Sequence, residues 1–130
     1  MTGSVKGRDN IHNHLETMIK NAKKSVTIAT TSKGLVRKYA ALKNVLSKAK
    51  QRGVELNFVA PLDKESKSTA DQLSKISKVS SSDIRTRLCL VDGKELLFML
   101  SDDEKVHPSY DVGVWVNTEF FGNVLEKVIQ

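Results

Sequence analysis

The sequence predicts an α/β domain in which a mixed, mostly parallel sheet is flanked by helices. Two observations support this prediction. Apolar, β-branched stretches at 25–31 and 54–61 enclose a helical pattern, which is the order of a βαβ unit with parallel strands. Residues 84–103 contain two further strand-like runs joined by Asp92-Gly93, the dipeptide that favours a two-residue hairpin turn.

The elements before the βαβ unit are a short tail and a helix. Residues 1–7 are small and polar, so we predict a linker or ragged N-terminus there and a single domain over residues 8–130. From Asp9, with Asp9 or Asn10 as N-cap, apolar residues recur on one stripe of an amphipathic helix. The stripe comprises Ile11, Leu15, Met18, Ile19 and Ala22.

Some of the remaining elements have a strong sequence pattern and others a weak one. A second helix over 35–52 carries an apolar stripe and ends at Gly53. Residues 62–83 are polar and predict at most a weak helix, whereas 111–117 alternate as a strand. Thr118 is placed to cap a terminal helix. The apolar residues expected to dock that helix on the core are Phe121, Val124, Leu125 and Val128.

Charge is unevenly distributed along the chain. The net charge is +6, and residues 1–53 hold 12 lysines and arginines against two acids, while residues 54–130 hold 9 against 13. This asymmetry favours either a nucleic-acid partner on the first two helices or a solvated surface. The lysines in question are Lys20, Lys23, Lys24, Lys43 and Lys50.

The cysteine content and the hydropathy of the sequence predict the cellular compartment of the protein. The single Cys89 has no internal disulfide partner and lies in an apolar strand, so we expect an inert, buried thiol in a reducing compartment. No run of about 18 apolar residues and no leader pattern occurs, and we therefore expect a cytoplasmic protein without a membrane partner.

Two polar groupings are candidates for ligand contact. Arg85 and Arg87 alternate onto one face of their strand, which suits a small anionic ligand, an acidic partner or a solvated face. The loop containing Thr31, Ser32 and Lys33 precedes a helix, where amides either hold an anion or are simply capped. Trp115 is expected to pack rather than line a ligand pocket.

The sequence offers few catalytic groups. His12 and His14 stand two apart, so they face different directions, and surface histidines are expected. There is no cysteine pair, nucleophile-elbow motif or phosphate-binding P-loop motif. We therefore predict a protein that is not an enzyme and that needs no metal or cofactor.

The hairpin nevertheless resembles the active-site strand and turn of the phospholipase D superfamily. The family pattern, His-x-Lys, four residues, then Asp, falls on Arg85, Arg87 and Asp92, so both the nucleophilic histidine and the lysine are replaced. The later Gly-Ser-x-Asn element retains only Ser101. Asp92 and Ser101 therefore join the candidate anion-binding residues, although Asp92 most simply serves the turn. The resemblance implies a phospholipase D-like half that keeps the scaffold without the chemistry, since a guanidinium stays protonated and cannot act as the nucleophile.

A second resemblance extends over nearly the whole chain. The segments VKGRDNI, AKKSVTIATT, AKQRGVELNFVAP, VDGKELLFML and DVGVWVNTEFF together resemble the regulatory domain of archaeal TrmB-type transcriptional regulators. This implies a non-catalytic effector-binding or dimerisation domain, a homodimer, and DNA contact through a winged helix that we expect to be absent from this chain. The alternative is a stand-alone basic nucleic-acid-binding module on a catalytically dead phospholipase D scaffold.

Overall fold

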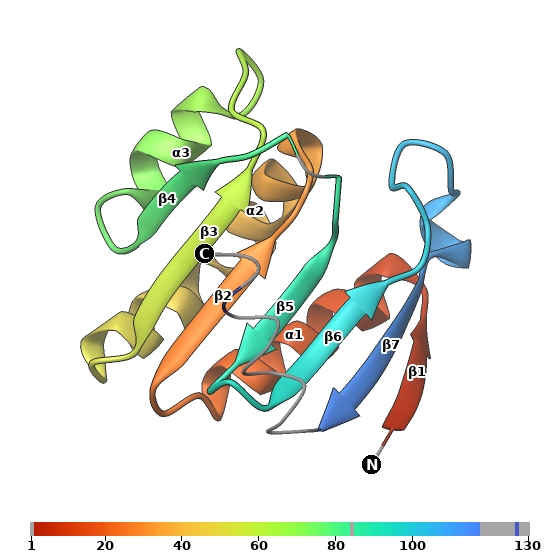
Figure 1. The fold of residues 1–130 in the computed structure, drawn as a ribbon, viewed down its shortest axis with the longest axis horizontal. Coiled ribbons are helices and arrows are strands. Elements are labelled where there is room, and N and C mark those ends of the chain that lie inside the picture. Colours follow the sequence, from red (N-terminus) through yellow and green to blue (C-terminus); the bar gives the residue numbers. More distant parts are fainter. Residues whose placement is uncertain (1, 84, 118–126, 128–130) are drawn as a thin grey trace.

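A computed structural model describes residues 2–83, 85–117 and 127. They form one seven-stranded sheet in the order β1-β7-β6-β5-β2-β3-β4 (Figure 1). The strands are β1 (Thr2–Lys6), β2 (Ser25–Ala29), β3 (Glu55–Ala60), β4 (Lys78–Ser81), β5 (Leu88–Val91), β6 (Glu95–Met99) and β7 (Val112–Asn117). The helices are α1 (Arg8–Lys20), α2 (Ser32–Gln51), α3 (Lys67–Leu73) and the short 3-10 helix η1 (Pro108–Tyr110).

The sheet is mixed, but the expectation that it is mostly parallel is wrong. Strand β2 pairs in parallel with β3, as the βαβ pattern predicted, and β3 pairs in parallel with β4. The pairs β2–β5, β5–β6, β6–β7 and β7–β1 are all antiparallel. The connections between strands explain the pairing directions. Helical crossovers join the parallel strands, whereas a hairpin joins the antiparallel strands β5 and β6.

The ends of the chain differ from the sequence prediction. Residues 1–7 were predicted as a linker, yet Thr2–Lys6 form β1, an edge strand whose partner is β7. The residue before α1 is Gly7, which turns the chain with a φ of 93°, instead of Asp9 or Asn10. The predicted terminal helix from Thr118 lies outside the described residues.

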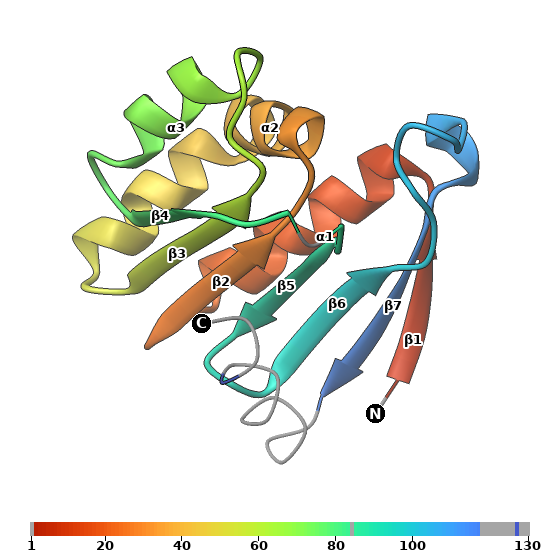
Figure 2. The same cartoon turned by 45° about the horizontal axis from the view of Figure 1, so that its top comes forward.

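The three longer helices pack on one face of the sheet (Figure 2). The predicted stripes of α1 and α2 are buried, with Leu15 and Leu42 at 0 and 1% exposure. They meet the sheet at Ile28 and Phe58, which are buried to a similar degree. The polar region 62–83 contains more structure than predicted, because α3 is followed by the edge strand β4.

The hairpin between β5 and β6 is confirmed. Asp92 and Gly93 adopt φ angles of 55° and 69°, and the amide of Lys94 donates to the carbonyl of Val91 at 3.1 Å. Positive φ at both central positions is the geometry that the Asp-Gly pair supplies. Among the described residues, no helix has the length and apolar character needed to cross a membrane.

Candidate functional site

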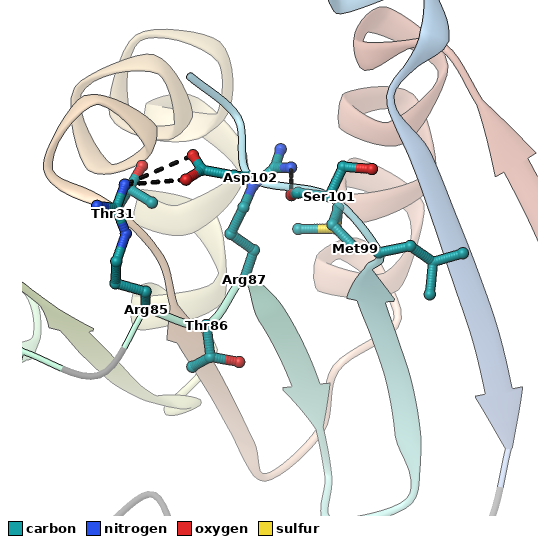
Figure 3. A pocket seen from close by; sticks show the side chains of 8 residues that line it. Thr31, Arg85, Thr86, Arg87, Met99, Ser101 and Asp102 are labelled. Atoms are coloured by element: carbon teal, nitrogen blue, oxygen red, sulfur yellow. Dashed lines mark hydrogen bonds and ion pairs between the residues drawn. The ribbon is translucent and has the colours of Figure 1, made fainter. Parts of the chain in front are cut away.

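A cavity of about 240 Å³ opens where β5 begins and β6 ends (Figure 3). It lies at the end of the hairpin opposite to the Asp92-Gly93 turn. Its lining combines two arginines, three hydroxyl side chains, an aspartate and two apolar side chains. The lining residues are Thr31, Arg85, Thr86, Arg87, Met99, Leu100, Ser101 and Asp102. We call this cavity the arginine pocket.

Arg87 is the buried arginine of the pocket, with 5% exposure. Its Nη1 and Nη2 donate to Asp111 Oδ1 and Oδ2 at 3.0 and 2.6 Å, and Nη1 also donates to the carbonyl of Ser101 at 2.8 Å. Its Nε has no hydrogen-bond partner among the described residues. A buried donor without a partner is costly, so the hydrogen-bonding capacity of Arg87 is not fully used by these contacts.

Arg85 is the exposed arginine of the pocket, with 61% of its side chain accessible. Its Nη2 lies 3.2 Å from Asp102 Oδ2 and 3.6 Å from Glu104 Oε2, and Figure 3 shows it beside Asp102. Such solvent-exposed ion pairs are weak, about 0–1 kcal/mol each. The two arginines thus share the pocket, as the alternation predicted, but only Arg87 is fixed by buried partners.

Asp111 is fully buried and fixes the position of Arg87, which lines the pocket. Besides Arg87, it accepts a hydrogen bond from Arg8 Nε at 3.2 Å, while its carbonyl accepts the Gly7 amide at 2.7 Å. Burial opposes ionisation of this carboxyl, but the hydrogen bonds and charges of the two arginines outweigh it and lower the pKa of Asp111. Asp111 therefore connects the pocket with the beginning of α1.

Asp103 forms a second, partly buried ion pair with Arg37, whose side chain is 29% exposed. Its Oδ2 accepts from Arg37 Nη2 at 2.6 Å and from the Thr31 hydroxyl at 2.7 Å. Burial disfavours its charge, but these two donors prevail and lower the pKa of Asp103 to about 2. Thr31 also caps α2, because its hydroxyl accepts the Gly34 amide at 2.9 Å.

Lys38 is the least expected member of the site, since only 2% of it is exposed. Its Nζ has one hydrogen-bond partner among the described residues, the hydroxyl of Thr30 at 3.3 Å. Burial, reinforced by the positive charges of Arg87 and Arg37, lowers the pKa of Lys38 to about 7. Lys38 therefore gives up its proton far more readily than an exposed lysine does.

The structure brings together some of the predicted site residues. Thr31, Arg85, Arg87 and Ser101 all line the pocket, and the backbone carbonyl of Ser101 also accepts a hydrogen bond from Arg87. Ser32 instead donates to Asp63 at 2.6 Å in an adjacent hollow that also touches Arg85. Lys33 is exposed and is not among the pocket residues.

Asp92 was predicted to belong to the anion site, and this prediction is corrected by its position. Its carboxylate lies at the other end of β5, where it accepts the backbone amides of Lys23, Lys24 and Ser25 at 2.7–3.2 Å. A carboxylate that accepts several backbone hydrogen bonds is committed to holding the turn. Asp92 therefore has a structural position and does not reach the pocket.

The histidines differ from the surface positions that were expected. His12 and His14 are both partly buried, and burial together with Lys38 and Arg37 lowers the pKa of His12 to about 4. His14 meets Trp115 edge to face at 5.8 Å, and Trp115 packs against the core as predicted. Within the described ranges, no group of three or more His, Cys, Asp or Glu residues is placed to hold a metal ion. Cys89 is buried as expected, and burial raises the pKa of its thiol to about 12.

Sequence reasoning missed five charged members of the site, namely Arg8, Arg37, Lys38, Asp103 and Asp111. A signal for one of them was present. Leu35, Lys38 and Leu42 fall at i, i+3 and i+7, so Lys38 lies on the apolar stripe of α2 and faces the core. The two aspartates gave no such signal, because their partners are 24 to 103 residues away in the sequence.

The lysines proposed for nucleic-acid contact are all exposed. We call Lys20, Lys23, Lys24, Lys43 and Lys50 the lysine surface. Lys23 and Lys24 lie beside the Asp92 turn, at the opposite end of β5 from Arg87. The arginine pocket and most of the lysine surface therefore occupy opposite ends of the sheet.

The mixed sheet covered by helices on one face, with the pocket at the end of its hairpin, is the architecture of a phospholipase D-type domain. NucT from Helicobacter pylori has a similar structure, with a TM-score of 0.73 and 18% identity over 100% of this chain and 93% of that one. Nuc of Salmonella typhimurium, a phospholipase D family member, gives a TM-score of 0.69 at 16% identity over 100% and 93%. At such identities the likeness establishes the fold alone.

The chain belongs to the family described as transcriptional regulator TrmB, effector-binding-domain N-terminal subdomain, whose model matches residues 3–127. The archaeal chromatin protein TrmBL2, whose structure is described as showing a novel mode of DNA binding, has a TM-score of 0.74 and 16% identity. The match covers 98% of this chain and 50% of TrmBL2, so this chain spans half the length of that relative. No sequence among the curated proteins matches this chain.

Proposed function

We propose that this chain is the non-catalytic effector-binding domain of a cytoplasmic TrmB-type transcriptional regulator, and that the arginine pocket binds a small anion. The observation that carries the proposal is the unpartnered Nε of the buried Arg87, in a cavity that Arg85 also lines. Two guanidinium groups are well suited to bind a carboxylate, phosphate or sulfate.

The absence of catalysis is part of this proposal. The residue at the position of the family nucleophile is Arg85, and its guanidinium cannot attack phosphorus. The thiol of Cys89 is fully buried and has a raised pKa, so it lacks the thiolate character of a nucleophile. A pocket that keeps hydrogen-bond donors but lacks the histidine of the family motif would retain binding and lose turnover by the family's chemistry.

We further propose that the domain dimerises and that the regulator acts on DNA through a winged helix. Phospholipase D-type halves commonly present two motif copies to each other, which would place the arginine pockets near a two-fold axis. Light scattering should give the mass of two chains at high micromolar concentration. A mass equal to one chain under those conditions would count against the dimer.

Anion binding is tested by titrating sulfate into the protein and measuring the heat. The variant Arg85→Met should weaken binding by about tenfold, since it removes one charged donor while its side chain is largely exposed and carries little stability. Lys64→Met is the matched control, because it removes an exposed positive charge that does not line the pocket. Equal affinity in Arg85→Met and Lys64→Met would refute the pocket as the anion site.

The second candidate function is nucleic-acid binding by the lysine surface. Two observations favour it: all five of its side chains are exposed, and the relative TrmBL2 is described as binding DNA. Binding of a labelled duplex should fall by orders of magnitude between about 50 and 200 mM salt, because phosphate contacts release counterions. Binding that is absent at low salt would eliminate this candidate.

A further inference from the structure

The arginine pocket adjoins a partly buried cluster that contains more positive than negative groups. On the positive side stand Arg8, Arg37, Arg87 and Lys38, and on the negative side stand Asp103 and Asp111. The two carboxylates are 6% and 0% exposed, and Lys38 is 2% exposed. Arg8 and Arg37 still reach solvent, with 13% and 29% of their side chains exposed. An unpaired charge is expensive away from water, so the cation of the cluster that lacks a counterion is the buried Lys38 when it is protonated.

The free hydrogen-bond donors of the cluster show where a counterion would bind. Asp111 occupies the end of the Arg87 guanidinium, and the Ser101 carbonyl takes a further N–H of Nη1. The free donors among the described contacts are therefore Nε–H and the second N–H of Nη2, which lie along one edge of the guanidinium. Such an edge binds two oxygens of one oxyanion side by side.

Lys38 has no carboxylate within ion-pair distance in the described part of the chain. Its one described hydrogen bond is to the Thr30 hydroxyl. The charged and titratable groups around it come from five places: Arg37 on α2, Arg87 before β5, Cys89 on β5, Asp103 after β6 and His12 on α1. Arg87 is the strongest charged influence among them and is also the residue that lines the pocket.

We infer that an oxyanion entering the arginine pocket is bound together with a proton, and that Lys38 is the group that takes it. The inference rests on the proposed anion site. A negative charge at the free edge of Arg87 offsets the repulsion between Arg87 and Lys38, which favours the ammonium form of Lys38. Binding of the effector would thereby be stronger in a slightly acidic solution than in an alkaline one.

The test is sulfate binding by titration calorimetry at about pH 6 and about pH 8.5, where sulfate itself stays a dianion, and the affinity should be about tenfold weaker at the higher pH. Around Lys38, the pKa of His12 is lowered to about 4, that of Cys89 is raised to about 12 and that of Asp103 is lowered to about 2. None of these three groups should therefore change charge in this pH range. Repeating the titration at about pH 7.5 in two buffers of different ionisation heat should show uptake of about half a proton or more.

Two variants separate the contribution of Lys38 from a general charge effect. Lys38→Met should bind sulfate with an affinity that no longer depends on pH. Lys43→Met, an exposed lysine on the same helix, should keep the pH dependence of the wild-type protein. Retained pH dependence in a folded Lys38→Met variant would overturn the inference.

Measurements on the wild-type protein alone also test the role of Lys38 and the anion site separately. Sulfate binding that is equally strong at both pH values, with no proton uptake, would overturn the role of Lys38 and leave the anion site standing. Failure of the wild-type protein to bind sulfate at either pH would overturn the proposed anion site and the proton coupling with it.

Discussion

The two ends of the sheet both concentrate positive charge, but they hold it in different physical states. At the pocket end, Arg87 is buried and tied to Asp111 by two hydrogen bonds of 3.0 and 2.6 Å. At the other end, Lys23 and Lys24 extend into solvent, and it is their backbone amides that are bound by Asp92. These charges contribute equally to the net charge, but only the buried Arg87 is held in one position by hydrogen bonds to a carboxylate.

This difference shows that burial determines whether a cationic side chain is held in one position or stays hydrated. A buried guanidinium requires a partner, so its position is fixed and its remaining donors are directed. An exposed ammonium keeps its water and adds to a diffuse potential. We therefore expect substitutions at the pocket end to change stability and binding, and substitutions at the lysine surface to change only long-range electrostatics.

The largest effect is expected from Asp111→Ala. This change leaves Arg87 and Arg8 without their buried carboxylate, and breaking a buried pair in this way costs about 3–5 kcal/mol. Urea denaturation measures the loss. Asp102→Ala, which removes the partner of the exposed Arg85, is the control and should cost about 1 kcal/mol or less. Equal losses in the two variants would show that the pocket end is no more organised than a surface.

A smaller loss is expected from Gly34→Ala. A Cβ at this position would collide with the hydroxyl of Thr30, which is the partner of Lys38, and would lie 2.9 Å from that of Thr31. Overpacking of this kind costs about 1–3 kcal/mol, whereas alanine normally stabilises a helix interior relative to glycine by about 1 kcal/mol. Asn44→Ala on the exposed face of α2 is the control, and a stabilised Gly34→Ala protein would contradict the prediction.

Stability should also rise with pH because of Lys38. Its pKa falls from 10.5 to about 7 on folding, so the unfolded chain binds more protons between these values. The free energy of unfolding should therefore increase by about 1 kcal/mol per pH unit between about pH 7.5 and 8.5. Above that range the increase should level off, because folding raises the pKa of Cys89 from 9.0 to about 12 and the unfolded thiol then loses its proton first. Denaturation at several pH values measures the slope. Lys38→Met should flatten it and Lys43→Met should not; a slope of the same size in Lys38→Met would assign it to another group.

The smallest effect is expected at the lysine surface. Replacing both Lys23 and Lys24 with glutamine should change the free energy of unfolding by about 0.5 kcal/mol or less, because neither ammonium has a described partner. Thermal denaturation at low and moderate salt would check this. A loss well above 1 kcal/mol would mean that this end is also organised by specific contacts and would remove the contrast between the two ends.

Much of the fold could be predicted because its signals are local. The apolar stripes of α1 and α2 repeat at helical spacing, and Asp92-Gly93 carries its turn preference within two residues. The strand β1 could not be found in this way. Its sequence is polar, and it becomes a strand through pairing with β7, which lies more than 100 residues later.

The candidate site was predictable only in part, for the same reason. Alternation placed Arg85 and Arg87 on one side of the chain, and both line the pocket. It did not show that one is exposed and the other buried, because burial depends on Asp111 and on the loop after β6. Asp92 was assigned to the site from a spacing pattern, whereas the direction of β5 carries it to the far end of the sheet.

The pairing of β1 with β7 has a consequence for the order of synthesis. The first described strand leaves the ribosome long before its partner, so β7 completes the sheet only after almost the whole chain has been made. Until that pairing forms, β7 presents an open edge with the valine-rich sequence VGVWVN. Chains that lose their first six residues would keep that edge permanently open, and such chains should self-associate into aggregates.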